Sequence, residues 1–254
     1  MDEAIDTNVP RMELIEEIIL KNYTHFHEQL TEVTLSDPIY HSLLTGIAMG
    51  DRRTHSAFKR ARISEETGNP ALRYLCQNDL IERESPVLQP SGKEEVDDKL
   101  NFSTPFLRFW FAFISPLFKG IQAGDYSEVA ERFENRKEGF SDLVFEKLSI
   151  ELLKKSFEND PIVEVGSYWD KELEIDILAK TASGKVIAGE CKYANAKLKK
   201  STLSNLKERC GKLGLDPDIF ILFSKRGFSS ELRSLKGENL RLFSAKNFKK
   251  LIED

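Results

Sequence analysis

The sequence lacks several features that would each point to a particular class of protein. It has only three cysteines, Cys76, Cys191 and Cys210, whose spacing fits neither a disulfide framework nor a metal site. Its most apolar run, residues 106–118, is interrupted by an arginine and a proline and is too short to span a bilayer. The first ten residues are acidic and contain no apolar core of a secretory signal. We therefore expect a cytoplasmic protein without a membrane segment.

Two further absences concern nucleotides and nucleic acids. No G-x-x-x-x-G-K-[ST] phosphate loop occurs, because the GK pairs at Gly92, Gly184 and Gly211 lack the upstream glycine and a following Ser or Thr. ATP hydrolysis by this chain is therefore not supported. The net charge is −5, so overall charge does not favour nucleic-acid binding. From Lys192 onward, however, basic residues outnumber acidic ones by about two to one.

The 254 residues, of which 40% are hydrophobic and 31% are charged, describe a soluble globular protein with one large or two small domains. Residues 1–104 read as an N-terminal helix followed by a winged helix-turn-helix domain. Helical patterns cover 11–33, 36–50, 54–61 and 64–80, and a polar hairpin follows as the wing.

In winged-helix modules the last helix normally enters the major groove of DNA. The candidate base readers on that helix are Asn69, Arg73 and Gln77. The alternative is a module that contacts protein or acts as a spacer, because the sequence EEVDD makes this wing acidic.

Residues 105–139 read as a helical connector that includes the aromatic stretch 106–118. Residues 140–254 then give an amphipathic helix, three strands, a helix, a strand, a helix, a strand and a helix. This order predicts an α/β domain with helices layered on a central sheet.

The segment 172–193, ELEIDILAKTASGKVIAGECKY, predicts two strands joined by a short turn. If the turn is centred near Ser183, Asp176 and Glu190 lie opposite one another, and Lys192 shares a face with Glu190. Opposed carboxylates on antiparallel strands have Cβ atoms about 5 Å apart and repel. A proton, the neighbouring lysine or a bound cation can relieve this repulsion. Two carboxylates and the Cys191 carbonyl are oxygen ligands of the kind that Mg²⁺ or Mn²⁺ accepts.

An Asp followed on the next strand by Glu-x-Lys resembles the PD-(D/E)XK signature of restriction-endonuclease-like nucleases. The matching residues are Asp176 and Glu190-Cys191-Lys192, while Ile175 stands where the signature has a proline. The resemblance implies a restriction-endonuclease-like α/β/α domain with a mixed central sheet. It also suggests Glu146 on the preceding helix as an additional acid, with Glu151 as the alternative on that helix.

A wider resemblance covers residues 36–230. The stretches YHSLLTGIAMG, RYLCQNDLIERESPV, FSTPFLRFWFAFISP, VGSYWDKELEIDILAK and GECKY follow in an order similar to the C-terminal half of archaeal-type ATPases. That half consists of a winged helix and a PD-(D/E)XK-like domain, and the ATPase domain has no counterpart here. An ATPase acting in trans and a homodimer are partners that fit this resemblance.

The resulting hypothesis is a Mg²⁺- or Mn²⁺-dependent nuclease acting on DNA. The metal would be held by Asp176, Glu190 and the Cys191 carbonyl, while Lys192 would orient water or neutralise developing charge. Three lysines, Lys197, Lys199 and Lys200, would contact phosphates, although such a run is also typical of a solvated face. The alternative is a non-catalytic DNA-binding or adaptor protein that keeps the nuclease fold, in which Glu190 and Lys192 form a simple ion pair.

Overall fold

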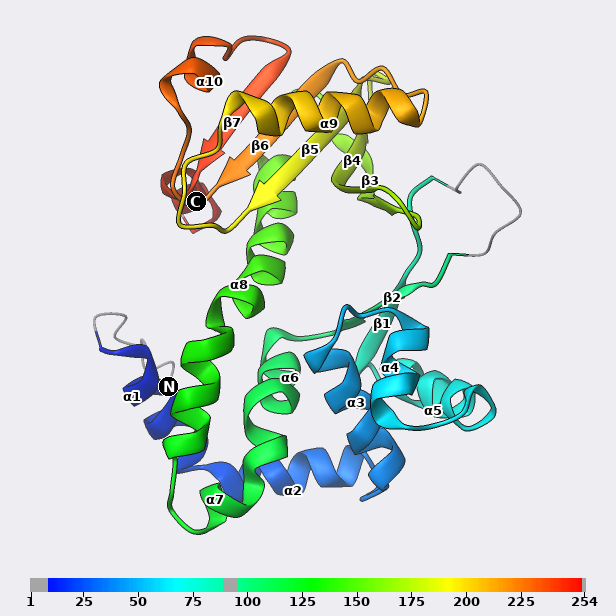
Figure 1. The fold of residues 1–254 in the computed structure, drawn as a ribbon, viewed down its shortest axis with the longest axis vertical. Coiled ribbons are helices and arrows are strands. Elements are labelled where there is room, and N and C mark those ends of the chain that lie inside the picture. Colours follow the sequence, from blue (N-terminus) through cyan, green and yellow to red (C-terminus); the bar gives the residue numbers. More distant parts are fainter. Residues whose placement is uncertain (1–8, 89–95, 253–254) are drawn as a thin grey trace. The chain divides into compact units, whose positions relative to one another are not determined.

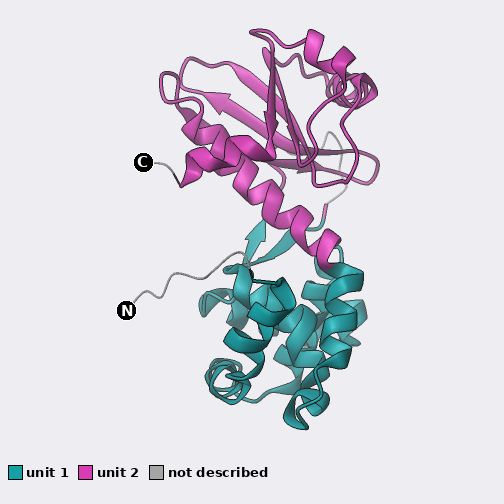
Figure 2. Cartoon of the chain, turned by 90° about the vertical axis from the view of Figure 1, so that its left-hand side faces the viewer, with its two compact units in different colours: residues 1–85, 97–136 teal, residues 86–96, 137–254 magenta. Residues whose placement is uncertain are grey.

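The computed structural model describes residues 9–88 and 96–252. The chain divides into two compact units (Figure 2): Met1–Ser85 with Asp97–Arg136, and Pro86–Val96 with Lys137–Asp254. The division falls within one long helix, so that helix contributes residues to both units.

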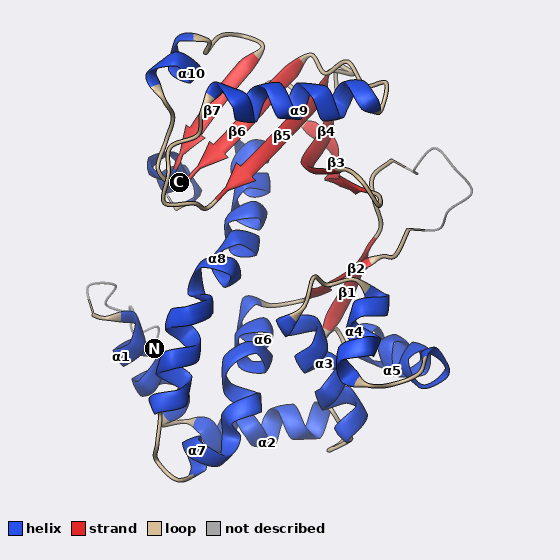
Figure 3. Ribbon diagram, viewed as in Figure 1, coloured by secondary structure: helices blue, strands red, loops and turns tan. Residues whose placement is uncertain are grey.

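The first unit is helical apart from one hairpin (Figure 3). Its helical elements are α1 (Arg11–Ile15), η1 (Glu16–Leu20), α2 (Tyr23–Val33), α3 (Pro38–Met49), α4 (Thr54–Ala61), α5 (Glu65–Gln77), α6 (Pro105–Phe109), η2 (Trp110–Ile114), η3 (Ser115–Leu117), α7 (Phe118–Gln122) and the first part of α8 (Ser127–Lys155). Strands β1 (Ile81–Glu84) and β2 (Lys99–Phe102) pair antiparallel, which confirms the predicted hairpin. Residues 89–95, which include Glu94 and Glu95 of the acidic stretch of the wing, lie outside the described residues.

Local sequence explains where these helices begin. The Asp37 carboxylate accepts a hydrogen bond from the Ile39 N–H at 2.8 Å and so caps α3, with a proline at its first position. The Ser64 hydroxyl caps α5 by accepting from the Thr67 N–H. The single helix predicted over 11–33 is wrong, because the backbone widens into the π-turn η1 and α2 starts afresh at Tyr23. An asparagine side chain just before α2 donates to the Ile18 carbonyl at 3.0 Å and closes the preceding turn.

The aromatic stretch is the centre of the first unit's core. Trp110 and Phe111 are fully buried, and the Tyr23 ring stacks on Trp110 with centroids 5.5 Å apart. The packing role predicted for residues 106–118 therefore holds, although the stretch forms several short helical pieces rather than one helix.

The second unit is built on a five-stranded mixed sheet with the order β3-β4-β5-β6-β7 (Figure 1). The strands are β3 (Ile162–Trp169), β4 (Glu174–Thr181), β5 (Val186–Lys192), β6 (Ile219–Ser224) and β7 (Leu240–Ser244). The pairs β3–β4 and β4–β5 are antiparallel, whereas β5–β6 and β6–β7 are parallel. The predicted mixed α/β organisation is thus confirmed.

Helices cover both faces of this sheet. On one face, α9 (Lys200–Lys212) and α10 (Ser230–Ser234) pack on a cluster that includes Leu178, Ala188 and Leu222. On the other face, the end of α8 and the 3₁₀ helix η4 (Ala245–Leu251) pack on a cluster that includes Ile177 and Ile187. From Ile177 to Ala179 on β4 and at Ile187 and Ala188 on β5 the two clusters alternate with the side-chain period of two. Ile175 breaks this alternation, since it joins the α9 cluster where the β3–β4 register shifts.

Two sequence expectations need correction in this unit. The sequence predicts that the connector ends at residue 139 and that an amphipathic helix begins at 140, but α8 crosses this boundary as one helix of 29 residues. Gly139 does not interrupt it, since a glycine inside a helix costs only about 1 kcal/mol. The last helix is a 3₁₀ helix rather than an α-helix. Within the described parts of the chain, no helix has the length and apolarity needed to cross a membrane.

Candidate active site

The hairpin β4–β5 fixes the relative positions of the candidate acids. Its register pairs Lys180 with Val186 and Ile177 with Gly189. The paired register ends there, one residue before Asp176 and Glu190, and the charge of Glu190 acts on Asp176 across this end of the hairpin. The turn between the strands is closed by the Thr181 N–H, which donates to the Lys185 carbonyl at 3.0 Å, and contains Gly184 at φ +89°.

At the candidate acids, a side chain replaces the backbone in the hydrogen bonds between β4 and β5. The Cys191 N–H donates to the Asp176 Oδ2 at 2.7 Å, so a side-chain carboxylate takes the place of a backbone acceptor. The next carbonyl, that of Lys192, points to the opposite neighbour and accepts from the Lys225 N–H at 3.2 Å. Because successive carbonyls of a strand point in opposite directions, the Cys191 carbonyl points to the same side as its N–H. An oxygen from the backbone and the Asp176 carboxylate are therefore directed to one place.

Glu190 is held by two cations. Its side chain is only 5% exposed, and its Oε1 lies 2.8 Å from the Lys192 Nζ. Its Oε2 forms an ion pair with Arg209, which reaches in from α9. The Arg209 guanidinium also donates to the Glu174 carbonyl and, at 3.4 Å, to the Asn205 carbonyl. A buried carboxylate is costly to leave without partners, and here both oxygens have one.

Asp176 carries the strongest electrostatic signal of the site. Burial raises its pKa to about 7, and the negative charges of Glu190 and Glu146 act in the same direction. The Lys192 ammonium and the Cys191 N–H oppose this rise. Burial by itself lowers the pKa of Lys192, but Asp176 and Glu190 outweigh it and the net pKa is raised. The site therefore combines a charged ammonium with a carboxyl group, that of Asp176, whose ionisation is disfavoured by burial and by neighbouring carboxylates.

The structure distinguishes the two acids considered on α8. Glu146 acts electrostatically on both Asp176 and Cys191, which places it at the site. Glu151 is exposed and pairs with Lys154 at 2.9 Å. Of these two acids, Glu146 is therefore the one that lies near the hairpin.

Sequence reasoning missed two residues of this site. Asp142 interacts with Lys192 and accepts a hydrogen bond from the Tyr193 backbone N–H; desolvation raises its pKa in spite of both. Its position four residues before Glu146 puts it on the same helix face, which is a signal the sequence did contain. Arg209 offers no such signal, because its contact with Glu190 depends on how α9 packs on the sheet.

The proposed DNA-binding lysines lie outside this cluster. Lys197, Lys199 and Lys200 are exposed on the segment that leads into α9, and Lys200 lies 3.4 Å from the Glu231 carboxylate. Arg73 is exposed on α5 of the first unit. Their contact with phosphates or bases stays a prediction.

The donor set fits a hard divalent cation. Among the described residues, no group of three or more His, Cys, Asp or Glu side chains has the arrangement of a metal site. The candidate set instead combines two carboxylates with a backbone oxygen, which is the chemistry Mg²⁺ accepts while keeping several waters. Burial raises the pKa of Asp176 and the charges of Glu190 and Glu146 raise it further, and a cation bound beside it would act in the opposite direction.

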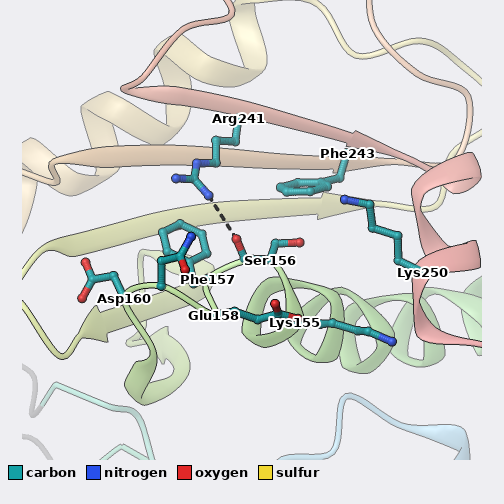
Figure 4. A pocket seen from close by; sticks show the side chains of 9 residues that line it. Lys155, Ser156, Phe157, Glu158, Asp160, Arg241, Phe243 and Lys250 are labelled. Atoms are coloured by element: carbon teal, nitrogen blue, oxygen red, sulfur yellow. Dashed lines mark hydrogen bonds between the residues drawn. The ribbon is translucent and has the colours of Figure 1, made fainter. Parts of the chain in front are cut away.

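A separate pocket of ≈ 510 Å³ lies at the end of α8 (Figure 4). The residues lining it are Lys155, Ser156, Phe157, Glu158, Asn159, Asp160, Arg241, Phe243 and Lys250. Arg241 lies over the Phe157 ring at 4.0 Å and donates to the Ser156 carbonyl at 3.4 Å, as expected of a cation that closes a helix C-terminus. The lining includes none of the candidate catalytic residues, so this pocket is separate from the candidate active site at the β4–β5 hairpin.

Comparisons with known proteins give two similarities. The family DUF234, described as archaeal and bacterial proteins of unknown function, matches residues 110–205, a range that contains the β4–β5 hairpin. A solved structure, the crystal structure of a repair endonuclease from Pyrococcus abyssi, is similar with a TM-score of 0.29 and 16% sequence identity. That similarity covers 41% of this chain and 44% of the endonuclease, so it extends over less than half of either protein. The comparison with curated proteins gives no match.

Proposed function

We propose that this protein is a metal-dependent nuclease that hydrolyses phosphodiester bonds of DNA, with a PD-(D/E)XK type of active site on a restriction-endonuclease-like domain. The observation that carries the proposal is the convergence of Asp176, Glu190 and Lys192 where the β4–β5 ladder ends. A purely structural ion pair does not require a second carboxylate whose pKa is raised to about 7 beside it.

Asp176, Glu190 and the Cys191 carbonyl would hold Mg²⁺ or Mn²⁺. When bound, such an ion lowers the pKa of a water and stabilises negative charge on a phosphate. Lys192, whose side chain is 47% exposed and whose ammonium pairs with Glu190, would hold the attacking water or neutralise charge that develops on the phosphate. Glu146 would orient that water from the α8 side.

The remaining parts of the chain would bind the substrate. Helices α3 to α5 with the β1–β2 hairpin follow the order of a winged helix-turn-helix module, and Arg73 on α5 would then contact DNA. Lys197, Lys199 and Lys200 would contact phosphates without reading sequence. Cleavage of both strands would suit a homodimer, and an ATPase could supply energy in trans.

One observation favours a second candidate function. Both oxygens of Glu190 are already paired, with Lys192 and with Arg209, as a scaffold without a bound metal would require. The alternative is therefore a non-catalytic DNA-binding or adaptor protein that retains the nuclease-like fold.

The decisive experiment compares cleavage of supercoiled, linear and branched DNA in Mg²⁺ or Mn²⁺ and in EDTA. Glu190→Gln and Lys192→Met are each expected to reduce the rate by about 100-fold or more, because each removes a charge that acts on the transition state. Matched controls are Glu164→Gln on β3 and Lys180→Met at the other end of the hairpin, both exposed. Equal rates for the site variants and the controls, or cleavage that persists in EDTA, would support the scaffold instead.

A further inference from the structure

We infer that Arg209 compensates the charge of Glu190 in the metal-free protein, as a divalent cation does when it binds there. Because the two compete, Arg209 sets the metal concentration at which the site fills. The inference rests on the proposed function and adds a regulatory element to the same site. Arg209 is a positioning residue, since its contacts are with Glu190 and the backbone.

The geometry shows how firmly Arg209 is placed. Its side chain is 22% exposed, and its guanidinium joins the Glu190 carboxylate to the Glu174 carbonyl at the start of β4. A third contact, to the Asn205 carbonyl one turn earlier on α9, holds the guanidinium from its own helix. Arg209 therefore bridges α9 and both strands of the hairpin at the end where the candidate ligands lie.

The charges at this end explain why such a bridge is needed. The carboxylates of Asp142, Glu146, Asp176 and Glu190 lie close together here, and Lys192 and Arg209 are the two cations that pair with Glu190. Without Arg209, one of the two ion pairs of Glu190 would be lost. A carboxylate as buried as Glu190 is costly to leave with a single partner, so the metal-free hairpin depends on the arginine.

The same guanidinium opposes a metal ion. A divalent cation bound to Glu190 would lie close to Arg209, and like charges at such a distance repel strongly in a partly buried site. The carbonyls of Glu174 and Asn205 can retain Arg209 if it releases Glu190. Metal binding would thus include the energetic cost of breaking the Arg209–Glu190 pair. Removing Arg209 should therefore strengthen metal binding.

The test measures Mn²⁺ affinity by isothermal titration calorimetry on the full chain without DNA. Arg209→Gln is expected to bind Mn²⁺ about tenfold more tightly than the wild type, because it removes one positive charge next to the ligands. The metal-free variant should melt at a lower temperature and gain more from added Mn²⁺. The control is Lys207→Gln, which makes the same charge change on α9 at a lysine that lies over the Phe220 ring, 5.1 Å from its centroid.

A milder variant keeps the inference testable if Arg209→Gln folds poorly. Arg209→Lys retains the charge but not the planar fork, so its Mn²⁺ affinity should lie between those of the wild type and the glutamine variant. Unchanged or weaker Mn²⁺ binding in both variants, with a wild type that does bind Mn²⁺, would overturn the role of Arg209 and leave the proposed nuclease intact. No Mn²⁺ binding by the wild type or any variant would overturn both.

Discussion

At the two ends of the β4–β5 hairpin, the surroundings shift the pKa of an aspartate in opposite directions. At the turn, Asp160 accepts hydrogen bonds from the Ser183 N–H at 2.8 Å and the Ser183 hydroxyl at 2.6 Å. These donors hold the Asp160 pKa below its usual value. At the open end, burial and the neighbouring Glu190 raise the Asp176 pKa to about 7.

The difference lies in the donors that each end supplies. At the turn, hydrogen bonds from Ser183 first, and then Thr181 and the charge of Lys185, stabilise the ionised form of an aspartate that remains in contact with water. The open end supplies Asp176 with one backbone N–H and brings further carboxylates close to it. The open end therefore brings together several carboxylates that need a cation nearby. A metal or phosphate site can be built from such an arrangement.

The largest effect that tests this contrast is on the pH dependence of stability. The Asp176 pKa is raised above its unfolded value of about 4, so the folded state binds the extra proton between about pH 4 and 7. Stability should therefore fall as the pH rises through that window. Asp176→Asn removes this loss and, in EDTA at pH 8, should be more stable than the wild type by on the order of 1–3 kcal/mol.

Urea denaturation at pH 5 and pH 8 measures this difference, with the exposed Asp216→Asn as the control. The gain of Asp176→Asn should shrink at pH 5, where the wild-type carboxyl is mostly protonated. An Asp176→Asn protein that is less stable than the wild type at pH 8 would show that the open end holds no excess of negative charge.

A smaller effect of the opposite sign is expected at the turn. Because the Asp160 pKa is lowered on folding, its contribution to stability is present above the unfolded pKa and is lost as the pH falls through the folded one. Asp160→Asn should therefore lower the melting temperature slightly at pH 7 and should cease to matter in strong acid. A double-mutant cycle with Ser183→Ala should show that most of the loss belongs to this pair. If Asp160→Asn stabilises the protein at pH 7, the contrast between the two ends fails.

Much of this contrast was predictable from the sequence, because it depends on short-range pattern. The alternation of β4 and the small residues of the turn predict the hairpin, and the observed register pairs Ile177 with Gly189, the residues next to Asp176 and Glu190. The order of strands and helices in the second unit follows from hydrophobic period in the same way.

What the sequence did not predict depends on packing over long distances or on competing backbone forms. The contact of Arg209 with Glu190 joins residues 19 positions apart through the packing of α9. The sequence does not predict the length of α8, because its polar first half and Gly139 are typical of a helix boundary. The π-turn that divides the first predicted helix has no counterpart in a 3.6-residue pattern.

The smallest effect is expected at Cys191, which stands between Glu190 and Lys192 but packs on the α8 face of the sheet. Burial raises the pKa of its thiol well above the usual value, so the sulfur stays protonated and is a poor nucleophile. Only its backbone oxygen belongs to the proposed donor set. Cys191→Ala should therefore keep the cleavage rate within about threefold of the wild type. In the native wild type, mass spectrometry after iodoacetamide treatment should find Cys191 unmodified. If Cys191→Ala folded normally but lost cleavage, the chemistry would involve both faces of β5, and the distinction between a charged face and a packed face at this end of the hairpin would have to be abandoned.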